Sequence, residues 1–249
     1  MMRTPSPQDA IHKAWLCRTL MAIYDEASLA KVLNFKGGTC AAMLGWLDRF
    51  SVDLDFDFVG AKADITPTRA ALEKVFADLG LEIKDQSPSA LQYFLKYAAQ
   101  PGQRNTLKVD ATFPAYKNNQ YRRYVFSEID RVINAQTKET MFGNKLVALI
   151  DRYNKTGAIA GRDIYDIHRF FMTGTGYNAA LITERTGQKL RVFFEALKKF
   201  IEKNINETIL SQDLNTLLPY DRFATLRKVL KPEVLVFIGD ELKRLASKG

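Results

Sequence analysis

Three aspartates alternate with apolar residues in one short segment of the chain. Asp53, Asp55 and Asp57 are separated by Leu54 and Phe56. In a strand, residues two apart point to the same face and lie about 6.5–7 Å apart, so the pattern predicts three carboxylates on one face. Carboxylates at this spacing suit a divalent cation such as Mg²⁺, which prefers oxygen ligands. A solvated acidic face is the alternative interpretation, because spacing alone does not separate the two.

A glycine pair lies upstream of these aspartates. Gly37 and Gly38 allow backbone N–H groups to approach an anion closely, and the start of a following helix adds unpaired donors and a favourable dipole. Lys36 beside them is expected to supply a mobile positive charge. The segment lacks the spacing of a Walker A motif, so a P-loop fold is not expected. The combination predicts a phosphate-binding turn, one helix and then paired carboxylates on the next strand.

The first half of the chain has the periodicities of an α+β fold. In the strand expected at 107–113, Lys108, Asp110 and Thr112 share one face. The remaining segments are predicted as helices at 7–30, 39–47 and 66–79, and as strands or extended pieces at 32–35, 52–59, 81–83, 91–97 and 121–126.

Helical periodicity replaces this mixture from about residue 137 and continues nearly to the end. We therefore expect two domains, residues 1–136 with a mixed sheet and helices, and residues 137–249 as a C-terminal helical domain. The helical stripes are Leu146 to Tyr153 and Ile164 to Phe171, followed by segments 188–204, 220–230 and 233–247.

Charged residues of the helical half raise a second question. Asp163 and Asp166 are three apart, so they are neighbours on one helix face. A structural salt bridge to Arg152 or Arg162 is one interpretation, and a place in an active site is the other. Lys145 lies away from the apolar stripe of its own helix, where an exposed lysine is the plainer interpretation.

Composition limits the classes of protein. With 47% apolar residues among 249, the chain can build a core, and no apolar run approaches the ~20 residues that a membrane span needs. The N-terminus lacks a signal-like apolar block, so we expect a cytosolic protein without membrane contact. Cys17 and Cys40 are expected to be buried free thiols, and two histidines exclude a histidine-rich metal cage. A net charge of +8 favours polyanionic partners such as nucleic acid, although a solvated basic surface remains the alternative.

These motifs together resemble a known family. The order Gly37-Gly38-Thr39, a helix, Arg49, Ser51 and Asp53-Leu54-Asp55 is similar to the nucleotidyltransferase superfamily that includes DNA polymerase beta, and within it to the AbiEii-type toxins of abortive-infection and toxin–antitoxin systems. The similarity extends to Lys145, Ala148 and Arg152 as a third motif, and to Arg162, Asp163 and Asp166 as a fourth. The motifs span residues 36 to 170.

The resemblance implies an NTP-dependent transfer that releases pyrophosphate, in a nucleotidyltransferase-like fold whose helical domain completes the active-site cleft. Asp53 and Asp55 would hold Mg²⁺, with Mn²⁺ as the alternative ion, and Asp110 would be the third carboxylate. The implied catalytic residues are Asp53, Asp55, Lys145 and Asp163. Those implied for nucleotide binding are Lys36, Gly37, Gly38, Thr39, Ser51, Lys145 and Asp166.

The acceptor separates three hypotheses. The resemblance implies that the toxin modifies the 3′ end of tRNA, blocks translation and is neutralised by a cognate antitoxin. An enzyme of the same chemistry that acts on a protein or small-molecule hydroxyl is the second hypothesis. The third is a non-catalytic basic protein that binds RNA or a partner.

Overall fold

The computed structural model describes residues 7–100, 102–215, 217–218 and 220–247. The described residues form two compact units. The sheet unit comprises those of Thr4–Ala115 and Gln120–Thr137, and the helical unit comprises those of Tyr116–Asn119 and Lys138–Gly249. The α+β class is confirmed, since a mixed sheet with helices is followed by helices alone.

The sheet unit is built on seven strands in the order β3-β4-β5-β2-β1-β7-β6. The central strand β2 runs parallel to β5 and antiparallel to β1. The strands are β1 (Leu33–Lys36), β2 (Asp53–Phe58), β3 (Glu82–Gln86), β4 (Leu91–Lys96), β5 (Thr106–Thr112), β6 (Tyr121–Phe126) and β7 (Arg131–Gln136).

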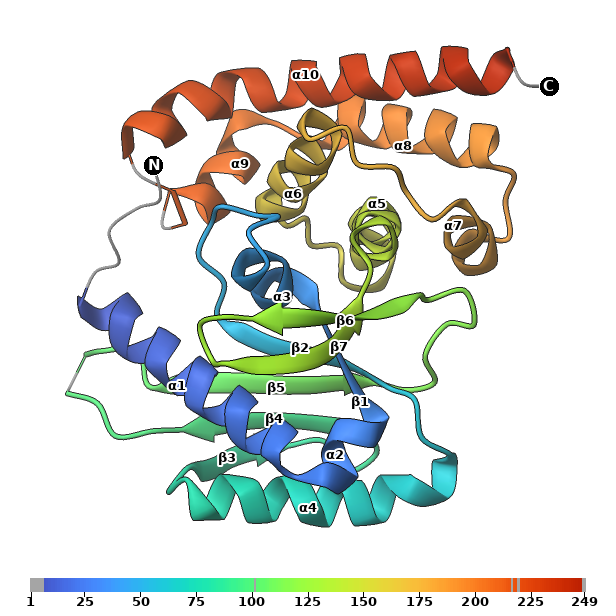
Figure 1. Ribbon diagram of the computed structural model, residues 1–249. Helices are drawn as coiled ribbons and strands as arrows, with labels where there is room; N and C mark the ends of the chain where they lie inside the picture. Colours follow the sequence, from blue (N-terminus) through green and yellow to red (C-terminus); the bar gives the residue numbers. More distant parts are fainter. Residues whose placement is uncertain (1–6, 101, 216, 219, 248–249) are drawn as a thin grey trace. The chain divides into compact units, whose positions relative to one another are not determined.

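Side-chain alternation gives this sheet one apolar and one polar face. Phe56 of β2 lies opposite Phe35 of β1, and both are fully buried. Tyr24 of α1 contacts the ring of Phe56, and Phe76 of α4 contacts that of Tyr93, so helices cover the apolar face (Figure 1). The helices of this unit are α1 (Pro7–Asp25), α2 (Ala27–Val32), α3 (Gly37–Met43), η1 (Lys62–Asp64) and α4 (Ile65–Asp78). The opposite face carries the aspartates of β2.

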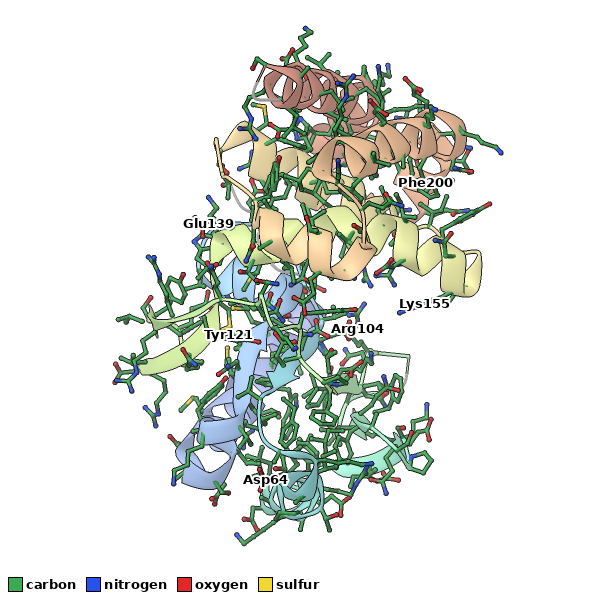
Figure 2. All side chains as sticks on the ribbon, turned by 90° about the vertical axis from the view of Figure 1, so that its right-hand side faces the viewer. Asp64, Arg104, Tyr121, Glu139, Lys155 and Phe200 are labelled. Atoms are coloured by element: carbon green, nitrogen blue, oxygen red, sulfur yellow. The ribbon has the colours of Figure 1, made fainter. Side chains whose placement is uncertain are left out.

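The helical unit packs its longest helix along two others. Figure 1 shows α10 beside α8, and α10 also contacts α6. Figure 2 marks Glu139 and Lys155 near the two ends of α5, the helix that carries Lys145. The helices are α5 (Lys138–Thr156), α6 (Gly161–Met172), α7 (Ala179–Thr186), α8 (Leu190–Asn204), α9 (Glu207–Leu214) and α10 (Tyr220–Ala246).

Several predicted boundaries are wrong for local reasons. The helix expected at 7–30 is two helices, because Glu26 accepts a hydrogen bond from the backbone N–H of Ser28 and starts a new helix. The helix expected at 39–47 begins at Gly37 and ends at Met43. The helices expected at 220–230 and 233–247 are one helix with Pro232 inside it.

Packing explains why α10 continues through its proline. Leu230, Val234 and Ile238 are four residues apart and fully buried, so one continuous stripe faces the core on both sides of Pro232. Lys231 donates to the backbone carbonyls of Glu202 and Ile205, at 2.8 and 2.7 Å, and so ties the same turn to the end of α8.

Within the described residues, no helix is both long and apolar enough to cross a bilayer.

Candidate active site

The glycine pair forms a bend directly against an aspartate of β2. Gly37 has φ of +82°, a conformation that favours glycine. A Cβ placed on Gly37 would lie 2.4 Å from Oδ2 of Asp55. The backbone of the bend therefore touches the carboxylate, and a side chain at Gly37 would push it away.

The next residues of the bend bring two further predicted residues to it. A Cβ on Gly38 would lie 2.8 Å from Nη2 of Arg49 and 2.8 Å from Oγ of Ser51. The hydroxyl of Thr39 donates to the backbone carbonyl of Asp53 at 2.5 Å, which ties the first turn of α3 to the start of β2. The sheet unit thus gathers Gly37, Gly38, Thr39, Ser51 and the aspartates in one place.

The three aspartates of β2 have different surroundings. Asp57 is buried and accepts hydrogen bonds from Lys36 Nζ at 2.7 Å, the Tyr121 hydroxyl at 2.9 Å and Gln136 Nε2 at 2.6 Å. Tyr121, labelled in Figure 2, belongs to β6, and Gln136 to β7. Asp57 is therefore fixed by donors from three other strands, as expected for a structural carboxylate.

Lys36 is held by the same cluster. Its ammonium lies 2.7 Å from Oδ1 of Asp57 and donates to the hydroxyl of Thr112 at 2.7 Å. The sequence leads us to expect a mobile positive charge beside the glycine pair. The structure instead shows an anchored one, whose charge still opposes the rise in pKa that burial gives Asp55.

Asp53 and Asp55 contrast with Asp57, since neither carboxylate has a hydrogen bond or ion pair within the described part of the chain. Burial raises the pKa of Asp55, and the charge of Asp53 raises it further. Two partly exposed carboxylates that repel each other offer hard oxygen ligands to a divalent cation, which would relieve the repulsion. The pair therefore fits the ion that the resemblance implies.

Asp110 lies beside Asp55 on the neighbouring strand. The two residues are register partners of β2 and β5, and Gln92 of β4 is the partner of Asp110 on its other side. Oδ2 of Asp110 accepts from Lys108 Nζ at 2.5 Å and from Gln92 Nε2 at 2.9 Å.

No group of three or more His, Cys, Asp or Glu side chains that could hold a metal ion occurs among the described residues.

The helical unit holds a second group of predicted residues. Asp163 and Asp166 of α6 are fully buried, and Lys145 Nζ of α5 lies 2.9 Å from a carboxylate oxygen of each. Arg152, one of the two arginines considered as a salt-bridge partner, lies 3.3 Å from Oδ2 of Asp163. Buried acids with two cationic partners form a fixed network that aims the lysine ammonium.

The helix that carries these acids is buried on most sides, which its apolar stripe alone did not predict. Ile164 and Ile167 are fully buried as expected, but so are Asp163, Tyr165 and Asp166. The ring of His168, on the same helix, makes a hydrogen-bonding contact through Nε2, which lies 2.5 Å from Oε2 of Glu233 in α10.

Four residues around the aspartates were not among the predicted site residues. Strand alternation places Lys108 on the face of Asp110, which is a usable signal. Gln92, Tyr121 and Gln136 give no such signal, because strand pairing alone brings them to the carboxylates. Cys17 and Cys40 are both free thiols as expected, but Cys40 is buried whereas Cys17 is only half-buried.

Solved structures show the same fold at low sequence identity. JHP933 from Helicobacter pylori is 20% identical with a TM-score of 0.60, over 98% of this chain and 96% of that one. A putative nucleotidyltransferase from H. pylori is 20% identical with a TM-score of 0.59, over 98% and 99%. The nucleotidyltransferase toxin MenT4 from Mycobacterium tuberculosis is 14% identical with a TM-score of 0.51, over 97% and 88%.

Sequence comparison identifies the family. No curated protein matches the chain at a significant level. The family model described as "Nucleotidyl transferase AbiEii toxin, Type IV TA system" matches residues 18–231, which is most of the chain and includes every predicted site residue. The chain therefore belongs to the AbiEii family of nucleotidyltransferase toxins.

Proposed function

We propose that this nucleotidyltransferase is an Mg²⁺-dependent toxin that transfers a nucleotide from an NTP to the 3′ end of tRNA and so blocks translation until a cognate antitoxin neutralises it. The observation that carries the proposal is the contact of the Gly37–Gly38 bend with Asp55 and Ser51, beside two carboxylates that have no partner among the described residues. A phosphate-binding turn next to a cation site is the arrangement that a metal–triphosphate complex needs.

In the sheet unit, Asp53 and Asp55 would hold the cation. When bound, it would withdraw negative charge from the phosphoryl group that is transferred. The backbone N–H groups of Gly37, Gly38 and Thr39, at the start of α3, would donate to the β- and γ-phosphates, because first-turn N–H groups have no partner within a helix. The hydroxyl of Ser51 would add a donor beside Gly38. Lys36 would act through its charge, since its ammonium is anchored on Asp57.

In this proposal, Asp110 is not one of the two residues that hold the cation in the nucleotide-free protein. One of its oxygens already accepts two hydrogen bonds, and the other faces no donor among the described residues. A carboxylate held in this way is suited to accept the proton of the attacking hydroxyl or to join the cation as a third ligand.

In the helical unit, we propose that Lys145 neutralises charge on the triphosphate and that Asp163 and Asp166 position its ammonium. Both acids contact Nζ at 2.9 Å, so the lysine side chain is oriented before nucleotide arrives. The two units described above would correspond to the catalytic and helical domains predicted from the sequence.

A tRNA acceptor is supported by charge. The chain carries a formal net charge of +8, and phosphate contacts from lysine and arginine supply much of the affinity of proteins for nucleic acid. Binding should therefore weaken as salt is raised, and the cytosol is the compartment in which such an acceptor and its antitoxin would be met.

The test is a labelling reaction with purified protein, Mg²⁺ and each of the four labelled NTPs, in the presence of total RNA. We expect label in tRNA-sized RNA and its loss in Asp53→Asn and Lys145→Ala. Asp78→Asn is the matched control, because Asp78 is an exposed acid of α4 that pairs with the exposed Lys74 of the same helix. Expression of the wild type should arrest bacterial growth, and both site variants should relieve the arrest.

Other outcomes distinguish the alternatives. Label in protein or in a small molecule, with none in RNA, would replace the tRNA acceptor by another hydroxyl. Growth arrest that survives the double substitution Asp53→Ala and Asp55→Ala would contradict the enzymatic basis of toxicity.

A further inference from the structure

Four charged residues form a block on the polar face of two neighbouring strands. Asp53 and Asp55 of β2 are the register partners of Lys108 and Asp110 of β5. Partners on adjacent strands lie about 4.8 Å apart and alternate residues share a face, so the four side chains leave the sheet on the same side. The block contains three carboxylates and a single ammonium group.

The ammonium of Lys108 forms an ion pair with one of the three carboxylates. It lies 2.5 Å from Oδ2 of Asp110 on its own strand, whereas no ion pair joins it to Asp53, its partner across the strands, among the described residues. Gln92 donates to the same Oδ2 from the other side, at 2.9 Å. Asp110 is therefore neutralised and oriented by the chain itself, while Asp53 and Asp55 are not.

This ion pair is open to solvent. The side chain of Lys108 is 28% exposed and that of Asp110 is 25% exposed. Pairs with access to water contribute little to stability, so the ammonium can leave without disturbing the fold. By contrast, the carboxylate of Asp57 is 2% exposed and pairs with the ammonium of Lys36.

We propose that Lys108 is an internal counter-cation that competes with a divalent cation for Asp110. In the nucleotide-free protein, Asp53 and Asp55 provide the cation site, and Asp110 becomes a ligand only when Lys108 releases it. Lys108 is thus a positioning residue that sets the number of carboxylates at the cation. This inference rests on the proposed function, because it assumes the cation site of Asp53 and Asp55.

The experiment measures binding of Mn²⁺ to the metal-free full chain without nucleotide, from the electron paramagnetic resonance signal of unbound Mn²⁺. Four proteins form a cycle: the wild type, Lys108→Met, Asp110→Asn and the double variant. We expect Lys108→Met to tighten Mn²⁺ binding roughly tenfold in the wild-type background and less than about threefold in the Asp110→Asn background. The difference arises because only the first background has a carboxylate to release.

Two control variants separate the release of Asp110 from a general change in the electrostatic potential at the cation site. Lys108→Arg keeps a cation beside Asp110 and should bind Mn²⁺ within about twofold of the wild type. Lys96→Met removes a positive charge from β4, where Lys96 faces the exposed Glu82 at 3.6 Å. Its effect should be small and the same in both backgrounds. Urea unfolding of each variant checks that the fold is kept.

Equal tightening by Lys108→Met in both backgrounds would overturn the inference, since it would show a field effect without release of Asp110. The Asp53→Asn variant separates the cation site from the role of Lys108. If it loses Mn²⁺ binding but the cycle shows no coupling, the cation site stands and the role of Lys108 falls. If the wild type binds no Mn²⁺, or Asp53→Asn binds it equally well, both fall.

Discussion

The two units use aspartates in opposite ways. In the sheet unit, Asp53 and Asp55 are partly exposed and have no hydrogen-bonding or ionic partner among the described residues. In the helical unit, Asp163 and Asp166 are fully buried and share the ammonium of Lys145. Carboxylates without partners repel each other and suit a mobile cation, whereas paired ones orient a side chain of the chain itself. The pairing of an acid thus indicates its role better than its presence in a motif.

The largest expected effect contrasts an acid of each unit. Asp163→Asn should lower the free energy of unfolding by about 3 kcal/mol, because it removes a fully buried carboxylate that pairs with the partly exposed Lys145 and Arg152. Asp53→Asn should leave the free energy of unfolding unchanged within error, since it removes the repulsion between the carboxylates of Asp53 and Asp55. Urea denaturation of both variants measures the difference. Equal losses would contradict the contrast between paired and unpaired acids.

The second prediction concerns the bend that touches Asp55. Gly37→Ala should destabilise by about 1–3 kcal/mol and also abolish nucleotide transfer, because it strains the backbone and displaces the carboxylate. Gly80→Ala is the matched control, since Gly80 has φ of +70° but no neighbouring atom within 4 Å of the position that a Cβ would take. That control should lose stability through its backbone alone and keep activity. Loss of activity in both would show that the contact with Asp55 is not what matters.

The third prediction concerns the close packing of α6, the helix that carries Asp163 and Asp166, against α9. A Cβ on Gly161 would lie 2.6 Å from the backbone oxygen of Ile209, so Gly161→Ala should force α6 and α9 apart and cost about 1–3 kcal/mol. Gly239→Ala, in α10 with open space around it, should instead stabilise by up to about 1 kcal/mol. Thermal unfolding of the pair measures both, and a neutral Gly161→Ala would show that the contact yields easily.

The smallest effect is a dependence on pH. Because burial and Asp53 raise the pKa of Asp55, the folded protein holds this proton more tightly than the unfolded chain. This carboxyl therefore favours the folded state most at low pH, and its contribution declines as pH rises from its ordinary pKa of 3.8 through the raised one. Urea midpoints from about pH 4 to 7, with chelator present, should decline less steeply in Asp55→Asn. Parallel curves for the variant and the wild type would contradict this.

Much of the sheet could be predicted from local pattern. The alternation at 53–58 correctly placed the aspartates on one face and the aromatic residues on the other. Strand β7 was missed, because Asn134, Ala135 and Gln136 favour strands weakly and only pairing with β1 and β6 decides their conformation. The helices α7 and α9 were missed too, since each has eight residues and little periodicity.

The surroundings of the acids could not be predicted in the same way. The partners of Asp57 lie 21, 64 and 79 residues away along the chain, and no local pattern encodes such pairings. The same is true of Lys145, whose contacts with Asp163 and Asp166 depend on the packing of α5 against α6. The motifs predict which residues belong to the site, whereas tertiary structure decides which of them already have hydrogen-bonding or ionic partners within the chain.

The position of β2 inside the sheet has a consequence for motion. Its residues are hydrogen-bonded on one side to β5 and on the other to β1, so its amide hydrogens exchange with solvent only when neighbouring strands separate. Amides in the edge strands β3 and β6 have a neighbour on one side only and should exchange sooner. Asp53 and Asp55 therefore belong to a segment whose backbone should open only slowly. The backbone that carries these carboxylates is in place before a cation binds.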